Sequence, residues 1–178
     1  MKKNKVICVG EALIDRIWNK SNGGFTDFLG GAPANVACAL RKLNINSIFI
    51  GCLGSDDFGK KFIAEFNDLE VNVDFLQLDN DASTRVVNVD RDRFGDRFFS
   101  GFEANSHSLF ADEVLSRKLI EKKLPDLEKL FLETKYLVTG TILLSSPISA
   151  ETILFVVEKA KKFQVKIIID LNWREVFW

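Results

Sequence analysis

Short apolar runs alternate with stretches of helical periodicity along most of the chain, and this alternation is the strongest constraint on its fold. The runs are rich in β-branched residues and occupy Val6–Val9, Ser47–Ile50, Tyr136–Val138 and Val165–Ile169. Such runs are typical of strands buried on both faces of a parallel sheet. Helical patterns lie between them, at Pro33–Leu43, at Phe58–Leu69, within Ala111–Leu132 with an interruption at Pro125, and at Ser149–Phe163. The order predicts an α/β layer fold with right-handed crossovers.

Two segments, Glu11–Leu29 and Ala82–Glu103, break this rhythm and have the pattern of antiparallel β-structure. In the second segment, Thr84–Asp90 and Arg97–Gly101 flank a turn that contains a glycine. Charges of alternating sign begin at Arg85 and continue through this turn, as on a solvated hairpin. We therefore expect a small β lid over the main sheet, with these charged side chains in solvent.

The charge balance excludes several classes of partner. The 178 residues include 24 Lys or Arg and 25 Asp or Glu, so a general attraction to nucleic acid or an anionic membrane is not expected. An apolar content of 47% indicates a folded chain rather than a disordered one. Apolar stretches such as Ile153–Val157 are far shorter than the ~20 residues of a membrane-spanning helix, and Val6–Val9 is too short for a secretory signal. We expect a cytoplasmic protein.

Three kinds of site find no support in the residue pattern. Cys8, Cys38 and Cys52 are far apart and form no C-x-x-C pair, which predicts three buried thiols rather than disulfides or a zinc site. His107 is the only histidine and no G-x-S-x-G motif occurs, so a hydrolase triad is not supported. No G-x-G-x-x-G follows a predicted strand, so a dinucleotide-binding oxidoreductase, which shares the layered architecture, lacks its fingerprint.

Ligands of open parallel sheets bind beyond the carboxyl ends of the strands, so the segments that follow the predicted strands are the candidates for a site. Four of them carry glycines or polar residues: Gly10–Glu11, Gly30–Gly31, Gly51–Gly59 and Asp170–Arg174.

Within the third of these segments and just beyond it, Gly54–Lys61 has the G-x-x-x-x-G-K spacing of a phosphate-binding P-loop. However, Lys61 replaces the Ser or Thr that binds magnesium, and Asp56 and Asp57 would repel phosphate. We predict a strand-to-helix turn instead, with these carboxylates capping a helix that begins near Phe58.

The segment Gly30–Ala37, GGAPANVA, is the sharpest candidate for a binding site. Paired glycines let a ligand approach backbone N–H groups, the start of a helix offers the positive end of its dipole, and Pro33 suits the first turn. Asn35 falls within that turn, where its amide can both donate and accept hydrogen bonds. The alternative is a glycine turn that only feeds a packed, alanine-rich helix, and composition by itself favours this alternative. At Asp170–Arg174, a polar cluster and a simple helix N-cap remain equally open.

Three motifs resemble, in their order and spacing, those of the ribokinase-like (PfkB) carbohydrate kinases. They are Gly30–Ala37, Gly51–Gly59 and Asp170–Arg174. The resemblance runs from Val6 to Trp178, and Gly95–Phe98 and Asn172–Trp178 are most similar to the fructokinase branch.

The resemblance implies a ribokinase-like three-layer α/β/α sheet, present in part, with a small β lid. Residues 1–178 would be the N-terminal part of that domain, and residues 11–29 and 82–103 would be the lid segments inserted in it. The implied activity is phosphoryl transfer from ATP, with Mg²⁺, to a hydroxyl of a sugar held under the lid, with fructose as the leading candidate. A homodimer formed through the lid is implied as well.

The same resemblance assigns roles to individual residues. Asp15 and Asn35 would each bind sugar hydroxyls, because a carboxylate or an amide can pair with neighbouring hydroxyls. Gly30 and Gly31 would let the sugar approach the backbone. Arg174, with Asn172 in the same motif, would face the transferred phosphate or an anionic part of the substrate.

Members of this family are substantially longer, and their second half carries the glycine-rich anion hole, the aspartate general base and most of the ATP pocket. No stretch like D-T-x-G-A-G-D occurs in these 178 residues, which predicts no catalytic residue, no metal ligand and no complete ATP site in this chain. We expect no turnover by the chain alone. The alternative is a non-catalytic sugar-binding or regulatory module. The residues do not distinguish fructose from other ketoses or from 2-keto-3-deoxy sugar acids.

Overall fold

A four-stranded parallel sheet forms the centre of the computed structural model, which describes residues 3–19, 23–91, 97–102 and 109–173. The strand order is β10-β9-β1-β4. The strands are β1 (Lys5–Val9), β4 (Ser47–Ile50), β9 (Thr134–Gly140) and β10 (Lys166–Asp170). Because β1 has a neighbour on each side and helices above and below, its residues from Val6 to Val9 are all buried, which accounts for the continuous apolar run.

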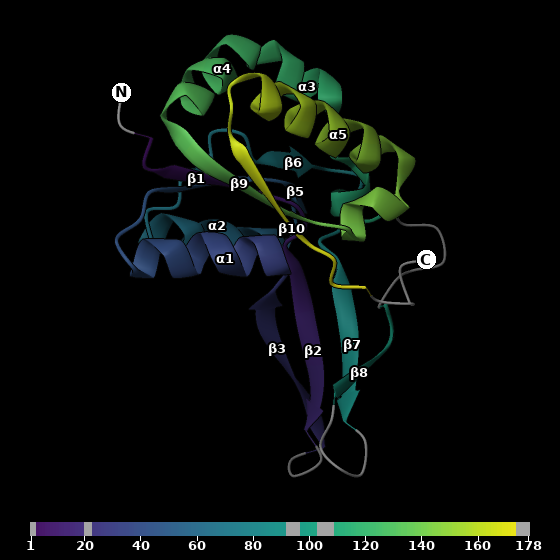
Figure 1. Ribbon diagram of the computed structural model, residues 1–178. Helices are drawn as coiled ribbons and strands as arrows, with labels where there is room; N and C mark the ends of the chain where they lie inside the picture. The colour runs from purple at the N-terminus through teal and green to yellow at the C-terminus, as the bar shows by residue number, and fades with distance from the viewer. Residues whose placement is uncertain (1–2, 20–22, 92–96, 103–108, 174–178) are drawn as a thin grey trace.

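Helices cover both faces of this sheet (Figure 1). One face carries α1 (Ala32–Lys42) and α2 (Asp57–Asp68), and the other carries α3 (Arg117–Lys122), α4 (Leu124–Glu133) and α5 (Pro147–Lys162). Alternate side chains of β1 enter the two cores. Ile7 and Val9 join the core under α4 and α5, whereas Val6 and Cys8 join the core over α1 and α2. The three-layer α/β/α fold predicted from the sequence is confirmed.

Local sequence explains where several helices begin. Pro125 and Pro147 lie in the first turns of α4 and α5, where a missing N–H leaves no helical bond unmade. Lys123 separates α3 from α4, close to the predicted interruption. Two short 3₁₀ helices, η1 (Ala111–Val114) and η2 (Ile142–Ser145), lead into α3 and α5.

The turn between β5 (Cys52–Gly54) and α2 is the predicted capped turn and not a P-loop. Asp56 is the N-cap, and its Oδ1 accepts a hydrogen bond from the Gly59 N–H at 2.8 Å. Its Oδ2 accepts a second bond from the Thr84 N–H at 2.7 Å. The short parallel pair of β5 with β6 (Gln77–Asp79) is not predicted by the sequence.

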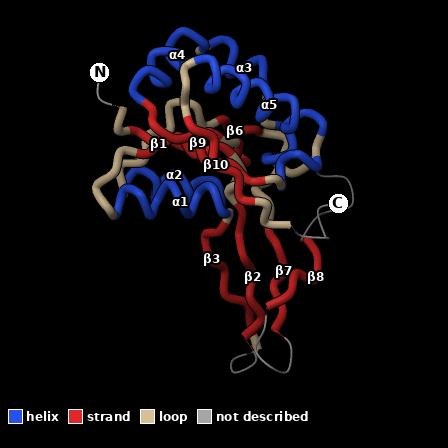
Figure 2. The backbone as a smooth tube through the Cα atoms, viewed as in Figure 1, coloured by secondary structure: helices blue, strands red, loops and turns tan. Residues whose placement is uncertain are grey.

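A second four-stranded sheet extends away from the layered body, as Figure 2 shows. We call it the projecting sheet; its order is β3-β2-β7-β8. Its strands are β2 (Leu13–Asn19), β3 (Gly24–Gly30), β7 (Val86–Arg91) and β8 (Arg97–Phe102). Strands β2 and β3 are antiparallel, as are β7 and β8, and the parallel pairing of β2 with β7 joins the two hairpins. Both segments expected to form β-structure contribute to this sheet, and its action as a lid stays a prediction.

The remaining chemical expectations concern cysteines, metals and membranes. Cys8 and Cys52 are buried and Cys38 is half-buried, and all three are free thiols. Among the residues that the structure describes, no three His, Cys, Asp or Glu side chains are grouped to hold a metal ion. Within the same residues, no helix has both the length and the apolar character needed to cross a membrane. His107 lies outside the described residues.

Candidate functional site

The predicted acid and the first glycine of the pair lie together where the projecting sheet meets the layered body. Asp15 is half-buried on β2, and Gly30 ends the neighbouring strand β3. A Cβ placed on Gly30 would lie 2.6 Å from Asp15 Oδ2, much closer than a carbon and an oxygen can approach. Glycine at this position, which is itself buried, therefore leaves room for the Asp15 carboxylate.

The second glycine, Gly31, is required by the geometry of the turn. It is the N-cap of α1 with a φ of 93°, and a Cβ there would lie 2.5 Å from the carbonyl oxygen of Glu11. Its own carbonyl accepts the first helical bond, from the Asn35 N–H at 2.9 Å. The paired glycines thus let the end of β3, the start of α1 and the segment after β1 meet at one point.

Asn35 lies one helical turn further along α1, with an exposed side chain. It lines a cavity of about 240 Å³ between α1, α2 and β3. The other lining residues are Leu29, Ala34, Cys38, Ala39, Lys42, Phe62 and Glu65. Asp15 and Gly30 are not among them, so the structure brings these two residues together and leaves the side chain of Asn35 in a neighbouring hollow.

The segment after β10 is irregular, and no helix begins in its described part, which ends at Trp173. The Asn172 N–H donates to Asp170 Oδ1 at 3.1 Å, and Asn172 itself has a φ of 28°. The helix N-cap that the sequence left open is therefore not found as far as Trp173. Arg174, the predicted phosphate ligand, lies outside the described residues.

Glu11 is an acid of this region to which the sequence assigned no role, and it is 1% exposed. Its Oε1 accepts a hydrogen bond from the Ala32 N–H at 3.1 Å, and its Oε2 is buried without a hydrogen-bond partner among the described residues. The pKa of Glu11 is raised to about 7, chiefly by burial and also by the nearby Asp112 and Asp170, against the lowering effect of backbone hydrogen bonds. The only sequence signal was its position directly after β1.

A buried ion pair anchors the base of the projecting sheet to the body, and here the sequence prediction was wrong. Arg85, expected in solvent, is 3% exposed and binds Asp112 of η1 through two nitrogens, at 2.8 and 2.9 Å. Its guanidinium also contacts Glu113 at 3.0 Å and lies 4.1 Å from the ring centroid of Phe110. Although burial alone would lower the pKa of Arg85, the two carboxylates raise it above its usual value.

Two of the turns at this edge are occupied by acidic side chains of the chain itself. Glu11 accepts from the start of α1, and Asp56 accepts from the start of α2. A helix N-terminus attracts anions through its free N–H groups and its dipole, and at each of these two turns an acidic side chain already accepts one of those N–H groups. These two turns therefore do not fit the phosphates of ATP, with or without Mg²⁺.

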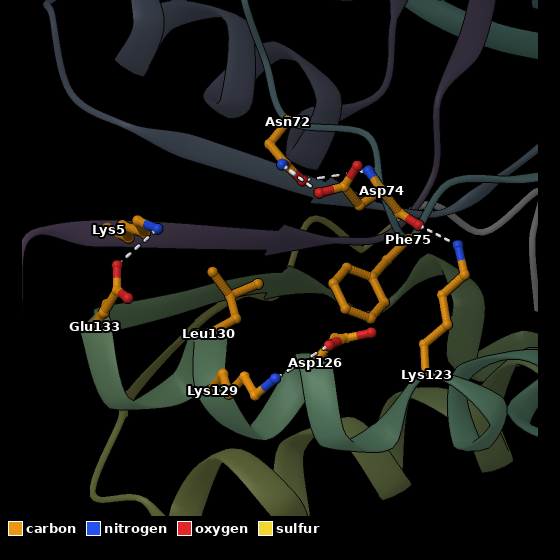
Figure 3. A pocket seen from close by; sticks show the side chains of 9 residues that line it. All are labelled: Lys5, Asn72, Asp74, Phe75, Lys123, Asp126, Lys129, Leu130 and Glu133. Carbon is orange, nitrogen blue, oxygen red and sulfur yellow. Dashed lines mark hydrogen bonds and ion pairs between the residues drawn. The ribbon is translucent and has the colours of Figure 1, made fainter.

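A larger cavity, of about 410 Å³, lies at the opposite end of the sheet, beside the start of β1 (Figure 3). All three of its ammonium groups have partners: Lys5 Nζ lies 2.7 Å from the Glu133 carboxylate, Lys123 Nζ donates to the Asp74 carbonyl at 2.6 Å, and Lys129 Nζ lies 3.7 Å from the Asp126 carboxylate. Its lining comprises Lys5, Asn72, Asp74, Phe75, Lys123, Asp126, Lys129, Leu130 and Glu133. None of the predicted site residues belongs to this cavity.

The layered body, the projecting sheet that leaves it after β1, and Asp15 packed against Gly30 are those of a ribokinase-like fold of the kind found in sugar kinases. The profile described as pfkB family carbohydrate kinase matches residues 3–178. The chain belongs to the pfkB family of carbohydrate kinases.

Known relatives agree with this assignment. A fructokinase of Salmonella typhimurium is 32% identical over 98% of this chain and 52% of its own length. An ATP-dependent 6-phosphofructokinase of Thermoanaerobacterium thermosaccharolyticum is 26% identical over 99% of this chain and 52% of its own length. The crystal structure of a fructokinase from Xylella fastidiosa matches 99% of this chain and 53% of its own with a TM-score of 0.83 at 28% identity, and a second structure of that enzyme contains bound ATP. The chain spans about half the length of the curated relatives it matches.

Proposed function

We propose that this chain forms the sugar-binding half of a kinase that phosphorylates a sugar hydroxyl with ATP, and that the sugar is fructose. The Asp15 carboxylate packed against the bare backbone of Gly30 carries the proposal. A carboxylate can accept hydrogen bonds from two adjacent hydroxyls, and the absence of a side chain at Gly30 leaves the Asp15 carboxylate its place beside the backbone. The fructokinases of Salmonella typhimurium and Xylella fastidiosa, related over nearly the whole chain, support fructose as the sugar.

The remaining predicted residues complete this proposal. Gly31 extends the bare backbone, and Asn35 provides an exposed amide one helical turn further on for another hydroxyl. Asn172 and Arg174 follow β10 and would meet the transferred phosphate or an anionic part of the substrate. The projecting sheet acts as the lid that closes over the sugar, in a cytoplasmic protein.

We further propose that this chain alone does not transfer phosphate. The filled turns at the starts of α1 and α2, and the lack of a D-T-x-G-A-G-D-like stretch, support this. ATP and Mg²⁺ would be held by the part of the fold that the longer relatives possess and this chain does not span. The alternative function, a non-catalytic sugar-binding or regulatory module, would likewise bind sugar without turnover.

Calorimetry with fructose, combined with a coupled assay of ADP release, tests both proposals. We expect saturable fructose binding by the 178-residue chain and no ADP release with fructose and Mg²⁺-ATP. Asp15→Asn should weaken fructose binding roughly tenfold or more, since a hydrogen bond to a charged group contributes about 1.5–3 kcal/mol. Asp90→Asn is the matched control, because Asp90 is a half-buried carboxylate further out on the same sheet. Absence of fructose binding would refute the sugar site, and steady turnover would refute the inactivity.

A further inference from the structure

The buried acid Glu11 occupies the point where the connections of the central sheet reverse direction. The chain leaves β1 for β4 on one side and later returns to β9 on the other side of β1. Ligands of open α/β sheets bind at such switch points, beyond the carboxyl ends of the strands. Glu11 follows the last residue of β1 by two positions and therefore lies at this switch point.

Glu11 joins the end of β1 to the start of α1 through both its side chain and its backbone. The side chain accepts the Ala32 N–H at 3.1 Å, and the carbonyl oxygen fills the space that a Cβ on Gly31 would need. The N-cap of α1 is a glycine and has no side chain to cap the helix, so the Glu11 carboxyl takes the place of the missing cap. The position of the paired-glycine turn, and with it the backbone beside Asp15, depends on this contact.

The second carboxyl oxygen of Glu11 accepts no hydrogen bond from the described residues. Oε2 is buried, has no hydrogen-bond partner among the described residues, and lies 3.8 Å from where a Cβ on Gly140 of β9 would be. The charged groups that face Glu11 from the surrounding elements are Asp112 of η1 and Asp170 of β10, both acidic. Arg85, directly before β7, is bound to Asp112. An ionised Glu11 would thus place a charge in a buried site whose described neighbours repel it.

We propose that Glu11 is a positioning residue for the sugar site: its carboxyl holds the start of α1 against the end of β1, and loss of its proton lets this junction open. Opening admits water to the charged carboxylate, breaks the contact with the Ala32 N–H and moves Gly30 and Gly31 away from Asp15. The pKa of Glu11, raised by burial to about 7, places this change near neutral pH. The effect on sugar rests on the proposed function, whereas the opening of the junction does not.

The first experiment follows the amide resonance of Ala32 by ¹⁵N NMR as pH is raised through neutrality. The wild-type resonance should shift with a single midpoint near a pH of about 7, because the Ala32 N–H bonds to the titrating carboxyl. Glu11→Gln keeps an oxygen acceptor but cannot titrate, so the shift should vanish. Glu133→Gln, at the amino end of the sheet, is the control and should retain it. A wild-type resonance that does not move through neutral pH overturns the proposal.

The second experiment measures fructose affinity by calorimetry at about pH 6 and about pH 8. If only the protonated form holds the turn in place, its population falls about tenfold over this interval for a pKa of about 7, and the apparent affinity falls with it. Glu11→Gln should bind with the same affinity at both values. Equal wild-type affinities at the two values overturn the role of Glu11. Absence of fructose binding at both values refutes the proposed function, and the Ala32 titration still tests the opening.

Discussion

At the scale of single residues, the paired glycines differ in what they do. Gly30 makes room for a side chain, the Asp15 carboxylate, whereas Gly31 makes room for backbone and has a left-handed φ of 93°. A short side chain can shift slightly, but two backbone segments cannot separate without moving a strand or a helix. We therefore expect Gly30 to matter for binding and Gly31 to matter for stability.

Gly31→Ala should lower the free energy of unfolding by about 3 kcal/mol or more, since the left-handed conformation costs an L-residue about 1–2 kcal/mol and the clash with Glu11 adds to it. Gly23→Ala is the matched control, because Gly23 has a φ of 68° but no neighbouring atom within 4 Å of the place that a Cβ would take. It should lose only about 1 kcal/mol. Urea unfolding of the two variants measures the difference, and equal losses would show that the Glu11 contact is unimportant.

The raised pKa of Glu11 predicts how the free energy of unfolding of the chain depends on pH. Its pKa of about 7 in the folded chain exceeds the ordinary value of 4.5, so its contribution is fully present below pH 4.5 and is lost as pH rises to about 7. The loss amounts to roughly 3 kcal/mol at most, from about 1.4 kcal/mol per pKa unit. Urea unfolding at several pH values should show this decline in wild type and a flatter profile in Glu11→Gln. Parallel profiles would contradict the raised pKa.

At the scale of elements, the Arg85–Asp112 pair connects the base of the projecting sheet to η1. Arg85→Met should destabilise the chain by about 3–5 kcal/mol, because Asp112 would remain buried without its cation. Arg117→Met is the control: this arginine is 41% exposed and pairs with Glu121 at the surface, so its loss should cost less than about 1 kcal/mol.

The double variant Arg85→Met, Asp112→Leu separates the contribution of the ion pair from that of the packing of Arg85 against the ring of Phe110. It removes both charges, so it should recover much of the stability lost in Arg85→Met. Chemical unfolding of both variants measures this coupling. A double variant as unstable as the single one would mean that the packing of Arg85 against the ring of Phe110, and not the ion pair, holds the element in place.

The positions of helices and strands were predicted well where a local sequence pattern determines them. Strand pairing and burial were predicted poorly where packing between distant segments determines them. The four core strands and α1, α2 and α5 agree with their predicted positions to within about two residues. The pairs β5 with β6 and β2 with β7 join segments far apart in the chain, and no local pattern marks such pairing. Arg85 was predicted in solvent because it begins a run of alternating charges, but η1 and Phe110 cover it.

At the scale of the whole molecule, both sheets carry exposed apolar side chains among the described residues. On the projecting sheet, Phe25 and Phe28 of β3 are more than half exposed. On the central sheet, β10 pairs with β9 alone among the described strands, and its residue Ile169 is also more than half exposed. Unpaired strand edges and exposed apolar side chains favour association. We propose that the projecting sheet forms a homodimer and that the β10 edge promotes larger species.

Sedimentation velocity over a range of concentrations tests this proposal. Wild type should sediment as a dimer with larger species at high concentration. Phe28→Lys should convert the dimer to monomer, and Ile169→Lys should remove only the larger species, because a charge on an edge strand opposes pairing. A wild-type chain that stays monomeric at every concentration and melts in one sharp transition would contradict both parts.

The sequence by itself determined the layered order of strands and helices and the positions of the capped turn at Asp56 and the glycine turn at the start of α1, since a local pattern of residues marks each of them. Only the tertiary structure decided the environment of Glu11, because α1, η1, β9 and β10 converge on it from distant parts of the chain. The same holds for the burial of Arg85. The burial and the charge environment of a side chain depend on every element packed around it, and a local sequence pattern does not identify those elements.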